Sequence, residues 1–187
     1  MIKFFIIFIM IPIISHKLLL FNKSTLVVDD YGYVHQTLFY LKDKRGRNEF
    51  PLKILSNGKK QFIFNPRKYM WAVYNKHGDR IMTGSASGGK DFCKDLGKSC
   101  RTVIGSFYIY HKKGVNCRSN EFFINKSNLG VKMPYCMFFF RGFSIHAAYE
   151  VPHANSSHGC IKVFPSAAEW LNKYFIRIGT QVVVLPY

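Results

Sequence analysis

Acidic side chains are scarce in this 187-residue chain. Asp and Glu together number 10 against 27 Lys and Arg, which leaves a formal net charge of +17. Apolar residues are not scarce: their share of 48%, with 17% aromatic residues, is enough to fill a hydrophobic core. Most of the chain is therefore not expected to be intrinsically disordered, and its length suits one domain with a leader or a small extension.

A concentrated basic arm is also missing, because the positive charge is spread along the whole chain. No recognisable nucleic-acid-binding module accompanies it, so nucleic acid is not an expected partner. A diffuse positive field favours anionic surfaces in general, including membranes and cell-wall polymers. The alternative interpretation is a lysine-rich composition without a functional role.

No apolar run in the chain is long enough for a comfortable membrane span. The longest comprises the eleven residues 4–14, a length typical of the core of a signal peptide. No small-x-small cleavage site follows it. We therefore predict that residues 1–21 are a signal peptide or an uncleaved membrane anchor, with a buried N-terminal helix as the alternative. Export to the periplasm or cell envelope follows from this prediction.

The remaining chain divides into a basic extension, residues 22–62, and a β-rich domain, residues 63–187. The extension holds one or two weak candidate strands, such as Val34–Leu41. In the domain, Asn75–Asp79 predicts a hairpin loop with Gly78 at its tight position. We find no internal repeat. The strands expected in the domain are Tyr69–Tyr74, Arg80–Gly84, Ser106–His111, Tyr135–Phe140, Phe143–His146 and Gln181–Leu185.

One helix is expected near the C-terminus. Ser166 and Glu169 have the spacing of a capping box, and Gly179 lies beyond the end of the helical pattern. The residues expected on its buried face are Trp170, Leu171, Tyr174 and Phe175. The sequence therefore predicts a mainly β domain with one packed C-terminal helix.

The five cysteines are consistent with an oxidising compartment, in which four of them can form two disulfides. Oxidation would block a nucleophile, so Cys160 is the natural unpaired residue. Of the three possible pairings of the others, we favour Cys93–Cys100, which closes a short polar loop, and Cys117–Cys136, which ties a polar loop to an apolar strand. Spacing alone does not decide between the pairings. Four free buried thiols are the alternative.

The most informative motif is Ser157-His158-Gly159-Cys160, preceded by His146. A cysteine attacks as its thiolate, so a catalytic cysteine needs a base or a positive neighbour. We predict that His146 is this base. The amides of Gly159 and Cys160 are candidate oxyanion donors, and His158 is a candidate to orient the loop or to lower the pKa of the thiol.

Three other interpretations of these residues are open. His146, His153, His158 and Cys160 are all potential zinc ligands, but their spacing fits no common zinc pattern, and no metal is expected. A buried, inert cysteine beside a surface histidine is the second. The third is a papain-type peptidase, in which Cys usually precedes His, although triads occur in different chain orders.

The motif resembles that of the L,D-transpeptidase (YkuD-type) family, in which a His is followed, after a gap, by Ser/Thr-His-Gly-Cys. The resemblance covers about residues 63–186. Flanking segments match the family in the same order: Trp71-Ala-Val-Tyr74, Gly78, Gly84-Ser-Ala-Ser-Gly-Gly89, Thr102-Val-Ile-Gly105-Ser-Phe107, Met133-Pro-Tyr135, Ile145-His146 and Gly179-Thr-Gln-Val182.

The resemblance implies a β-sandwich-like catalytic domain that acts on peptidoglycan stem peptides, as a monomer and without a cofactor. Cys160 would attack the third residue of a tetrapeptide stem and form a thioester. An amine of another stem would then give a 3→3 cross-link, and water would give L,D-carboxypeptidase activity. The backbone carbonyl of Ala147 would orient His146, and Ser157 would help to shape the site. Residues expected to contact substrate are Met133, Tyr135 and Lys162.

The chain departs from the family pattern at three positions. Ala147 stands where Gly is common, Val103 where Pro is common, and Lys162 where Arg is common. Lys162 keeps the positive charge but cannot bind a carboxylate in the bidentate manner of Arg. None of these changes removes a catalytic atom. The alternative function, based on the net charge, is a non-catalytic basic protein that binds the cell wall or a membrane surface.

Overall fold

The structure is a computed structural model that describes residues 25–28, 34–37, 49–123 and 129–187. The predicted leader, residues 1–21, lies outside the described residues. Within the described part of the chain, no helix is both long and apolar enough to cross a membrane.

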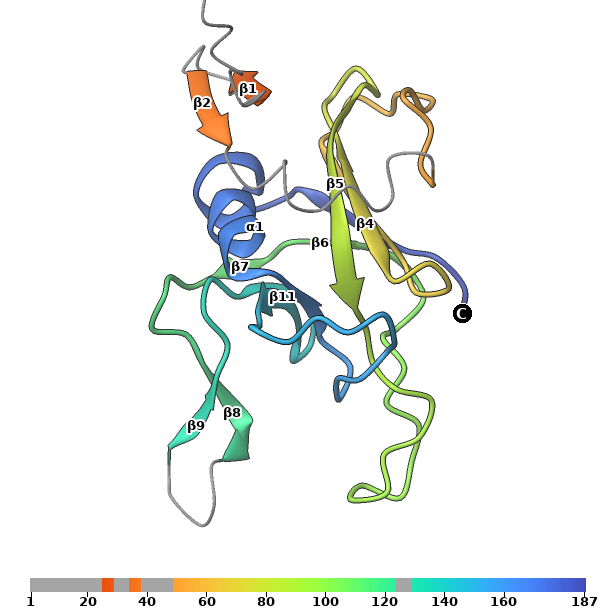
Figure 1. Cartoon of the computed structure of the whole chain (residues 1–187), viewed down its shortest axis with the longest axis vertical. Coiled ribbons are helices and arrows are strands. Elements are labelled where there is room, and N and C mark those ends of the chain that lie inside the picture. The colour runs from red at the N-terminus through yellow and green to blue at the C-terminus, as the bar shows by residue number, and fades with distance from the viewer. Residues whose placement is uncertain (1–24, 29–33, 38–48, 124–128) are drawn as a thin grey trace, which may run out of the picture.

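A nine-stranded sheet makes up most of the described chain (Figure 1). Its strand order is β6-β13-β3-β4-β5-β12-β11-β10-β7. Neighbouring strands are antiparallel except for the pairs β13/β3 and β11/β12, which are parallel. In chain order the strands are β3 (Gln61–Asn65), β4 (Met70–Tyr74), β5 (Arg80–Ser87), β6 (Gly105–Tyr108), β7 (His111–Lys112), β10 (Met137–Phe140), β11 (Phe143–Ala147), β12 (Ile161–Val163) and β13 (Gln181–Val184).

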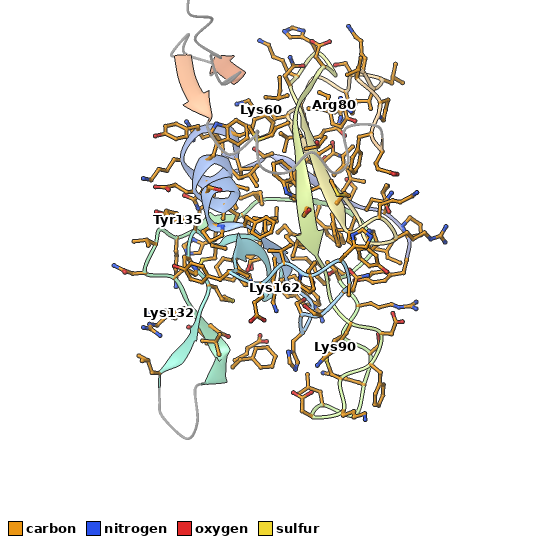
Figure 2. The ribbon with its side chains drawn as sticks, in the orientation of Figure 1. Lys60, Arg80, Lys90, Lys132, Tyr135 and Lys162 are labelled. Atoms are coloured by element: carbon orange, nitrogen blue, oxygen red, sulfur yellow. A yellow bond between two sulfur atoms is a disulfide. The ribbon has the colours of Figure 1, made fainter. Side chains whose placement is uncertain are left out.

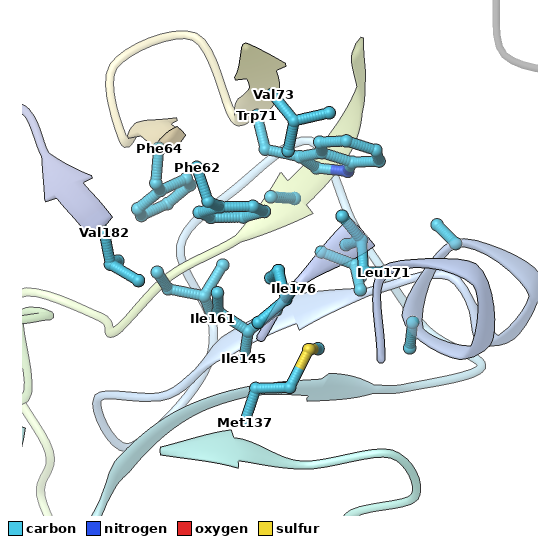
Figure 3. Packing of buried hydrophobic residues seen from close by; sticks show 14 of the residues in the cluster. Phe62, Phe64, Trp71, Val73, Met137, Ile145, Ile161, Leu171, Ile176 and Val182 are labelled. Carbon is cyan, nitrogen blue, oxygen red and sulfur yellow. The ribbon is translucent and has the colours of Figure 1, made fainter. Parts of the chain in front are cut away.

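Strand β5 joins the two halves of this sheet. Most of its length pairs with β4, whereas Ala86 and Ser87 at its end pair with β12. The sheet curls, and side chains from both halves meet in one core (Figure 3). Successive side chains on a strand point to opposite faces, and each half of the sheet turns one apolar face toward this core. The predicted mainly β, sandwich-like fold with a packed helix is confirmed. Core residues include Phe62, Phe64, Trp71 and Val73 from one half, and Met137, Ile145, Ile161 and Val163 from the other.

The predicted strand Ser106–His111 is wrong, because it is divided into β6 and β7, at opposite ends of the strand order. Between them the chain crosses from one half of the sheet to the other. The amide of Ile109 donates to the Thr180 carbonyl (2.9 Å), and the amide of Tyr110 donates to the Phe138 carbonyl (3.0 Å). The buried side chain of Ile109 anchors the crossing in the core.

Residues 49–54 cover the outer face of β4, whose five residues are all buried. Phe50 packs with Tyr74, and the Tyr74 hydroxyl donates to the Pro51 carbonyl at 2.9 Å. The amide of Ile54 donates to the carbonyl of Gly78, at 2.9 Å. The folded domain thus includes residues upstream of position 63.

The predicted hairpin between β4 and β5 is confirmed. Asn75 Oδ1 accepts hydrogen bonds from the amides of His77 (2.9 Å) and Asp79 (3.0 Å). Gly78 has a φ of 84°, and a Cβ there would lie 2.2 Å from the Ile54 carbonyl oxygen. The turn therefore requires glycine for both its conformation and its close packing.

The C-terminal helix is confirmed, but its predicted capping box is wrong. Helix α1 (Pro165–Trp170) follows Phe164, which makes no side-chain cap hydrogen bond, and Pro165 supplies a first residue without an amide proton. Glu169 instead accepts hydrogen bonds from Tyr135 (3.0 Å) and Lys173 (2.6 Å). The helix continues as the π-helical turn η2 (Leu171–Phe175), and its buried side chains pack onto the core.

Two small antiparallel sheets complete the described elements. Strands β1 (Thr25–Val28) and β2 (Val34–Thr37) form one of them. Strand β2 covers part of the predicted strand Val34–Leu41, whose remainder lies outside the described residues. Strands β8 (Arg118–Phe123) and β9 (Gly130–Lys132) form a hairpin at the lower end of Figure 1.

Both predicted disulfides are present, and Cys160 is the free cysteine. The Cα atoms are 5.8 Å apart in Cys93–Cys100 and 6.1 Å apart in Cys117–Cys136. The first disulfide closes the loop that follows β5. The second joins the chain just before β8 to the chain just before β10, so it fixes the base of the β8–β9 hairpin.

Gly89 marks the closest approach between the disulfide loop and the segment that carries Cys160. A Cβ at Gly89 would lie 1.7 Å from the Cys100 carbonyl oxygen and 2.9 Å from the Gly159 Cα. We expect Gly89→Ala to lower the free energy of unfolding by about 3 kcal/mol, because backbone must move to admit the methyl group. Urea unfolding measures this change. Gly114→Ala is the control, because nothing lies within 4 Å of its added methyl group; equal losses in the two variants would contradict the expectation.

Candidate active site

The site lies on the outer face of the parallel pair β11/β12. In this pair Ile145 lies opposite Ile161, and His146 lies opposite Lys162. Successive side chains on a strand point to opposite faces, and the two isoleucines point into the core. His146 and Lys162 therefore point outward. Ser144 lies two positions before His146 on β11, and Cys160 directly precedes β12; their side chains meet on this outer face, with Ser144 Oγ 3.6 Å from Cys160 Sγ.

His146 is held in one tautomer by its own strand. Its Nδ1 lies 2.9 Å from the carbonyl oxygen of Ala147. A carbonyl only accepts, so Nδ1 carries the proton and Nε2 is left with a lone pair. The hydrogen bond between His146 and the Ala147 carbonyl, which the family resemblance implies, is present. The methyl group of Ala147 does not obstruct it, because that side chain packs into the core.

His146 is neutral at physiological pH. Only 7% of the surface of His146 is exposed, and this burial lowers the pKa of the imidazole to about 4. The positive charge of Lys162 lowers this pKa further, whereas the hydrogen bond to Ala147 opposes the shift. The imidazole is therefore unprotonated at Nε2, which is the form that a general base requires.

The Cys160 thiol is half-buried and bonds to the strand beside it. Its Sγ lies 3.6 Å from Ser144 Oγ and donates to the Gly142 carbonyl at 3.9 Å. Burial raises the pKa of the thiol, and hydrogen bonds from Ser144 lower it in part. In this conformation the pair is a neutral thiol and a neutral imidazole.

Ser157 organises the turn that leads to the thiol. Its hydroxyl donates to the Cys160 carbonyl at 2.5 Å and accepts from the Gly159 amide at 3.0 Å. In this conformation the Gly159 amide is therefore not a free oxyanion donor, contrary to the expectation, because the hydroxyl of Ser157 occupies it. Gly159 has a φ of 122°, and a Cβ there would lie 2.5 Å from the Phe143 ring. Only glycine fits this turn.

His158 connects three parts of the molecule. Its Nε2 lies 2.7 Å from Asp95 Oδ2, in the loop closed by the Cys93–Cys100 disulfide. Its ring also lies 5.0 Å from the ring of Phe122, on β8. The same hydrogen bond lowers the pKa of the Asp95 carboxyl. His158 thus connects the loop before Cys160 to the disulfide loop and to the β8–β9 hairpin.

The disulfide loop is also joined to the nucleophile's loop through its backbone. The amide of Lys90 donates to the Ser157 carbonyl (3.0 Å), and the amide of Ser157 donates to the Gly88 carbonyl (2.9 Å). Ser87 Oγ bonds to the Ala154 carbonyl at 2.7 Å. The chain before Cys160 is therefore held on the side of β5 by several independent hydrogen bonds.

The three residues predicted to contact substrate are in different places. Lys162 is on the outer face beside His146, and Met133 packs with the Cys117–Cys136 disulfide in a cluster that Cys160 contacts. Tyr135 instead donates its hydroxyl to Glu169 on α1. In Figure 2, Lys162 lies between the β8–β9 hairpin and the loop that begins near Lys90, and Tyr135 lies beside the helix. Their contact with substrate stays a prediction.

The alternative zinc set, His146, His153, His158 and Cys160, does not form a cluster. The ring of His153 packs against Tyr69, 4.6 Å away. Among the described residues, one group of potential ligands comes together, namely Cys93, Asp95 and His158. Cys93 is bonded to Cys100, so it has no thiolate to offer a metal.

Sequence reasoning missed Ser144, Asp95 and Phe122. The strand period of two could have indicated Ser144, which is two residues before His146 on the same strand. No sequence pattern indicated Asp95 or Phe122, because their contacts with His158 depend on how the disulfide loop and the β8–β9 hairpin pack against the loop before Cys160.

The depressed pKa of His146 predicts a pH-dependent stability. Between pH 6.5 and about 4 the unfolded chain binds a proton at this residue and the folded chain does not, so stability falls as the pH falls. We expect the free energy of unfolding to be about 2 kcal/mol lower at pH 5 than at pH 7 through this residue. Urea unfolding at both pH values measures it. His146→Gln should lose this difference; an unchanged pH dependence in that variant would refute the assignment.

The raised pKa of Cys160 predicts slow alkylation at neutral pH. In the non-reduced protein, iodoacetamide should label one thiol, at a rate that rises with pH beyond the pKa of free cysteine. Ser144→Ala should move this profile to higher pH, because it removes a hydrogen bond to the sulfur. Mass spectrometry of quenched samples gives the rates, and Cys160→Ala is the unlabelled control. A rate plateau between pH 5 and 8 would instead indicate a thiolate–imidazolium pair.

Residues 59–184, two thirds of the chain, match the sequence model of the family described as L,D-transpeptidase catalytic domain, YkuD. No curated protein matches the chain.

Solved structures of L,D-transpeptidases have the same fold. That from Xylanimonas cellulosilytica is 22% identical with a TM-score of 0.59, over 82% of this chain and 71% of that one. For the protein from Stackebrandtia nassauensis the identity is 20% and the TM-score 0.59, over 76% and 62% of the two chains. For the protein from Mycobacterium smegmatis the identity is 20% and the TM-score 0.55, over 68% of this chain and 59% of that one.

Proposed function

The chain belongs to the L,D-transpeptidase catalytic domain family, and from this premise we propose that it modifies peptidoglycan stem peptides through a thioester on Cys160. The proposed donor is a tetrapeptide stem, and the reacting group is the carbonyl of its third residue. The leaving group is the terminal D-alanine. Each step uses groups of the chain itself and needs no cofactor.

In the first step His146 Nε2 takes the proton from the Cys160 thiol as the sulfur attacks the carbonyl carbon. The C=O electron pair moves onto oxygen, and the amide of Cys160 is the proposed donor to this oxyanion. When the tetrahedral intermediate collapses, the carbon–nitrogen bond breaks. The departing amine takes the proton from His146, which leaves a thioester and a neutral imidazole.

In the second step an acceptor attacks the thioester. His146 removes a proton from the acceptor, the carbon–sulfur bond breaks, and the thiolate takes the proton back. A side-chain amine from the third residue of another stem gives a 3→3 cross-link. Water as the acceptor gives L,D-carboxypeptidase activity.

One observation carries this proposal, namely the fixed tautomer of His146 on the face that also carries Cys160. The Nδ1–H bond to the Ala147 carbonyl leaves Nε2 as the basic atom, and the lowered pKa keeps it unprotonated. A histidine that was packed only for stability would not need an unprotonated ring nitrogen on the face that carries the thiol.

We also propose that the protein is exported and works in the cell envelope, where its substrate is. Two disulfides support this proposal, because they persist in oxidising compartments. The net charge of +17 adds a long-range attraction to anionic envelope polymers.

The test is a reaction of purified, oxidised protein with disaccharide-tetrapeptides. We expect release of D-alanine and a protein mass increase equal to the acyl group. Cys160→Ala should lower the release by about 10³-fold or more, and His146→Gln by about 10²-fold, because one removes the nucleophile and the other its base. Mass spectrometry follows both products, and 3→3 dimers or tripeptides identify the acceptor.

His153→Gln is the matched control, because this histidine lies in the same loop as Cys160 but packs against Tyr69. It should retain nearly full activity. Release of D-alanine by Cys160→Ala at the wild-type rate would overturn the proposal.

A further inference from the structure

Residues 90–101, the disulfide loop with its two flanks, expose two large apolar side chains. Phe92 is 57% exposed and Leu96 is 41% exposed. This loop projects from the lower end of the molecule, and residues 49–58 lie at the opposite end (Figure 1). Exposed apolar side chains that gather on a projecting loop indicate a surface that contacts another molecule or a membrane.

The backbone of the loop is fixed before any ligand arrives. A disulfide joins its two buried cysteines, Cys93 and Cys100. The Cys93 amide donates to the Lys98 carbonyl at 2.8 Å, and the Cys100 amide donates to the Lys90 carbonyl at 3.2 Å. Gly97, with a φ of 63°, lies in the turn between them. Binding through the side chains of this loop therefore costs little in backbone ordering.

Both carboxylates of the loop already have partners within the chain. Asp91 Oδ1 lies 2.8 Å from Arg101 Nε, and Asp95 Oδ2 lies 2.7 Å from His158 Nε2. The hydrogen bond with His158 holds the pKa of the Asp95 carboxyl below its usual range. The negative charges of the loop are therefore engaged at its base and against the domain.

The lysines of the loop alternate with its apolar residues, in the order Phe92, Lys94, Leu96 and Lys98. Lys94 and Lys98 are exposed, and no carboxylate of the described residues pairs with either of them. The loop thus presents available cations and apolar side chains together. The interface of an anionic lipid bilayer offers a partner for each, because phosphate groups lie directly above acyl chains there.

Other occupants of this surface supply only half of that combination. A second copy of the chain carries the same net charge of +17, so its approach is opposed by repulsion. An anionic wall polymer supplies charge for the lysines but no apolar layer for Phe92. An anionic membrane is therefore the partner that the loop fits.

We infer that residues 90–101 dock on the surface of an anionic phospholipid membrane. Phe92 and Leu96 enter the headgroup region. Lys94 and Lys98 bind the phosphate groups of the lipids.

The docked loop is joined to the candidate active site. It contains Asp95, which bonds to His158 in the motif that carries Cys160. Docking therefore holds this side of the site close to the membrane surface. The docking itself does not use the thiol, so Cys160→Ala should bind vesicles like the parent chain.

The test places a fluorescent residue in the loop of the full-length oxidised protein. The chain has two tryptophans, Trp71 and Trp170, and both are buried, so Phe92→Trp adds one exposed indole. With vesicles that contain phosphatidylglycerol, we expect its emission to shift to shorter wavelength and to be quenched by lipids brominated in their acyl chains. Vesicles of phosphatidylcholine alone should give little of either effect, and added salt should weaken the shift.

Leu55→Trp is the matched control, because Leu55 is an exposed apolar residue within residues 49–58, at the opposite end of the molecule. Its emission should stay unchanged when the same vesicles are added. Each indole reports only on its own position, so vesicle binding through another part of the chain does not imitate docking of the loop.

Further changes in the tryptophan-labelled loop separate charge from apolar contact. Lys94→Gln with Lys98→Gln should raise the vesicle concentration that gives half of the shift about tenfold or more, because both lysines bind phosphate. Leu96→Ser should raise it about threefold, because it removes apolar area. Lys59→Gln with Lys76→Gln is the control of equal charge change, at the end of the β3/β4 pair far from the loop, and should raise it about twofold or less. Thermal unfolding verifies that each variant is folded.

An unchanged emission of Phe92→Trp with anionic vesicles would overturn the inference, and so would an equal shift in Leu55→Trp. Binding to purified peptidoglycan that depends on Lys94 and Lys98, without insertion of the indole into vesicles, would assign the loop to the wall polymer and refute membrane docking. Release of D-alanine is measured separately, so failure of the docking is distinguishable from failure of the proposed function.

Discussion

The parallel pairing of β11 with β12 is the constraint on which the site depends. Because Ile145 and Ile161 pair and point into the core, the residues on either side of them must share the opposite face. If either strand turned its other face inward, as a one-residue shift in register requires, His146 or Lys162 would enter the core at a large cost in desolvation free energy. Core packing therefore sets the position of His146 relative to Cys160.

The nucleophile's loop depends on a second constraint, its attachment to the disulfide loop. Hydrogen bonds from Lys90 and Ser87, the close contact at Gly89 and the Asp95–His158 pair all act on the dozen residues before Cys160. The hairpin adds Phe122 from the other side. These contacts come from segments far apart in the sequence. Asp95 lies in the loop that Cys93–Cys100 closes, and Phe122 lies on the hairpin whose base Cys117–Cys136 joins, so both disulfides support the geometry of the site.

Much of this architecture could be predicted from the sequence, because its signals are local. Alternating apolar residues predicted several strands, and Asn75 and Gly78 predicted the β4–β5 hairpin. The cysteine count predicted two disulfides with Cys160 unpaired, and the character of the loops favoured the pairing that is present. The errors occurred where a long-range contact overrides a local pattern. The buried Ile109 divides one apparent strand in two, and Glu169 bonds to Tyr135 and Lys173 instead of capping its helix. The Gly159 amide bonds to Ser157, a contact that spacing does not reveal.

The burial that raises the pKa of Cys160 also affects how fast its thiol is oxidised. Oxidation to sulfenic acid, like alkylation, requires the thiolate and access to the sulfur. A thiol held neutral between Ser144 and the Gly142 carbonyl reacts slowly with peroxides. Surroundings oxidising enough to form Cys93–Cys100 and Cys117–Cys136 are thus compatible with a reduced Cys160.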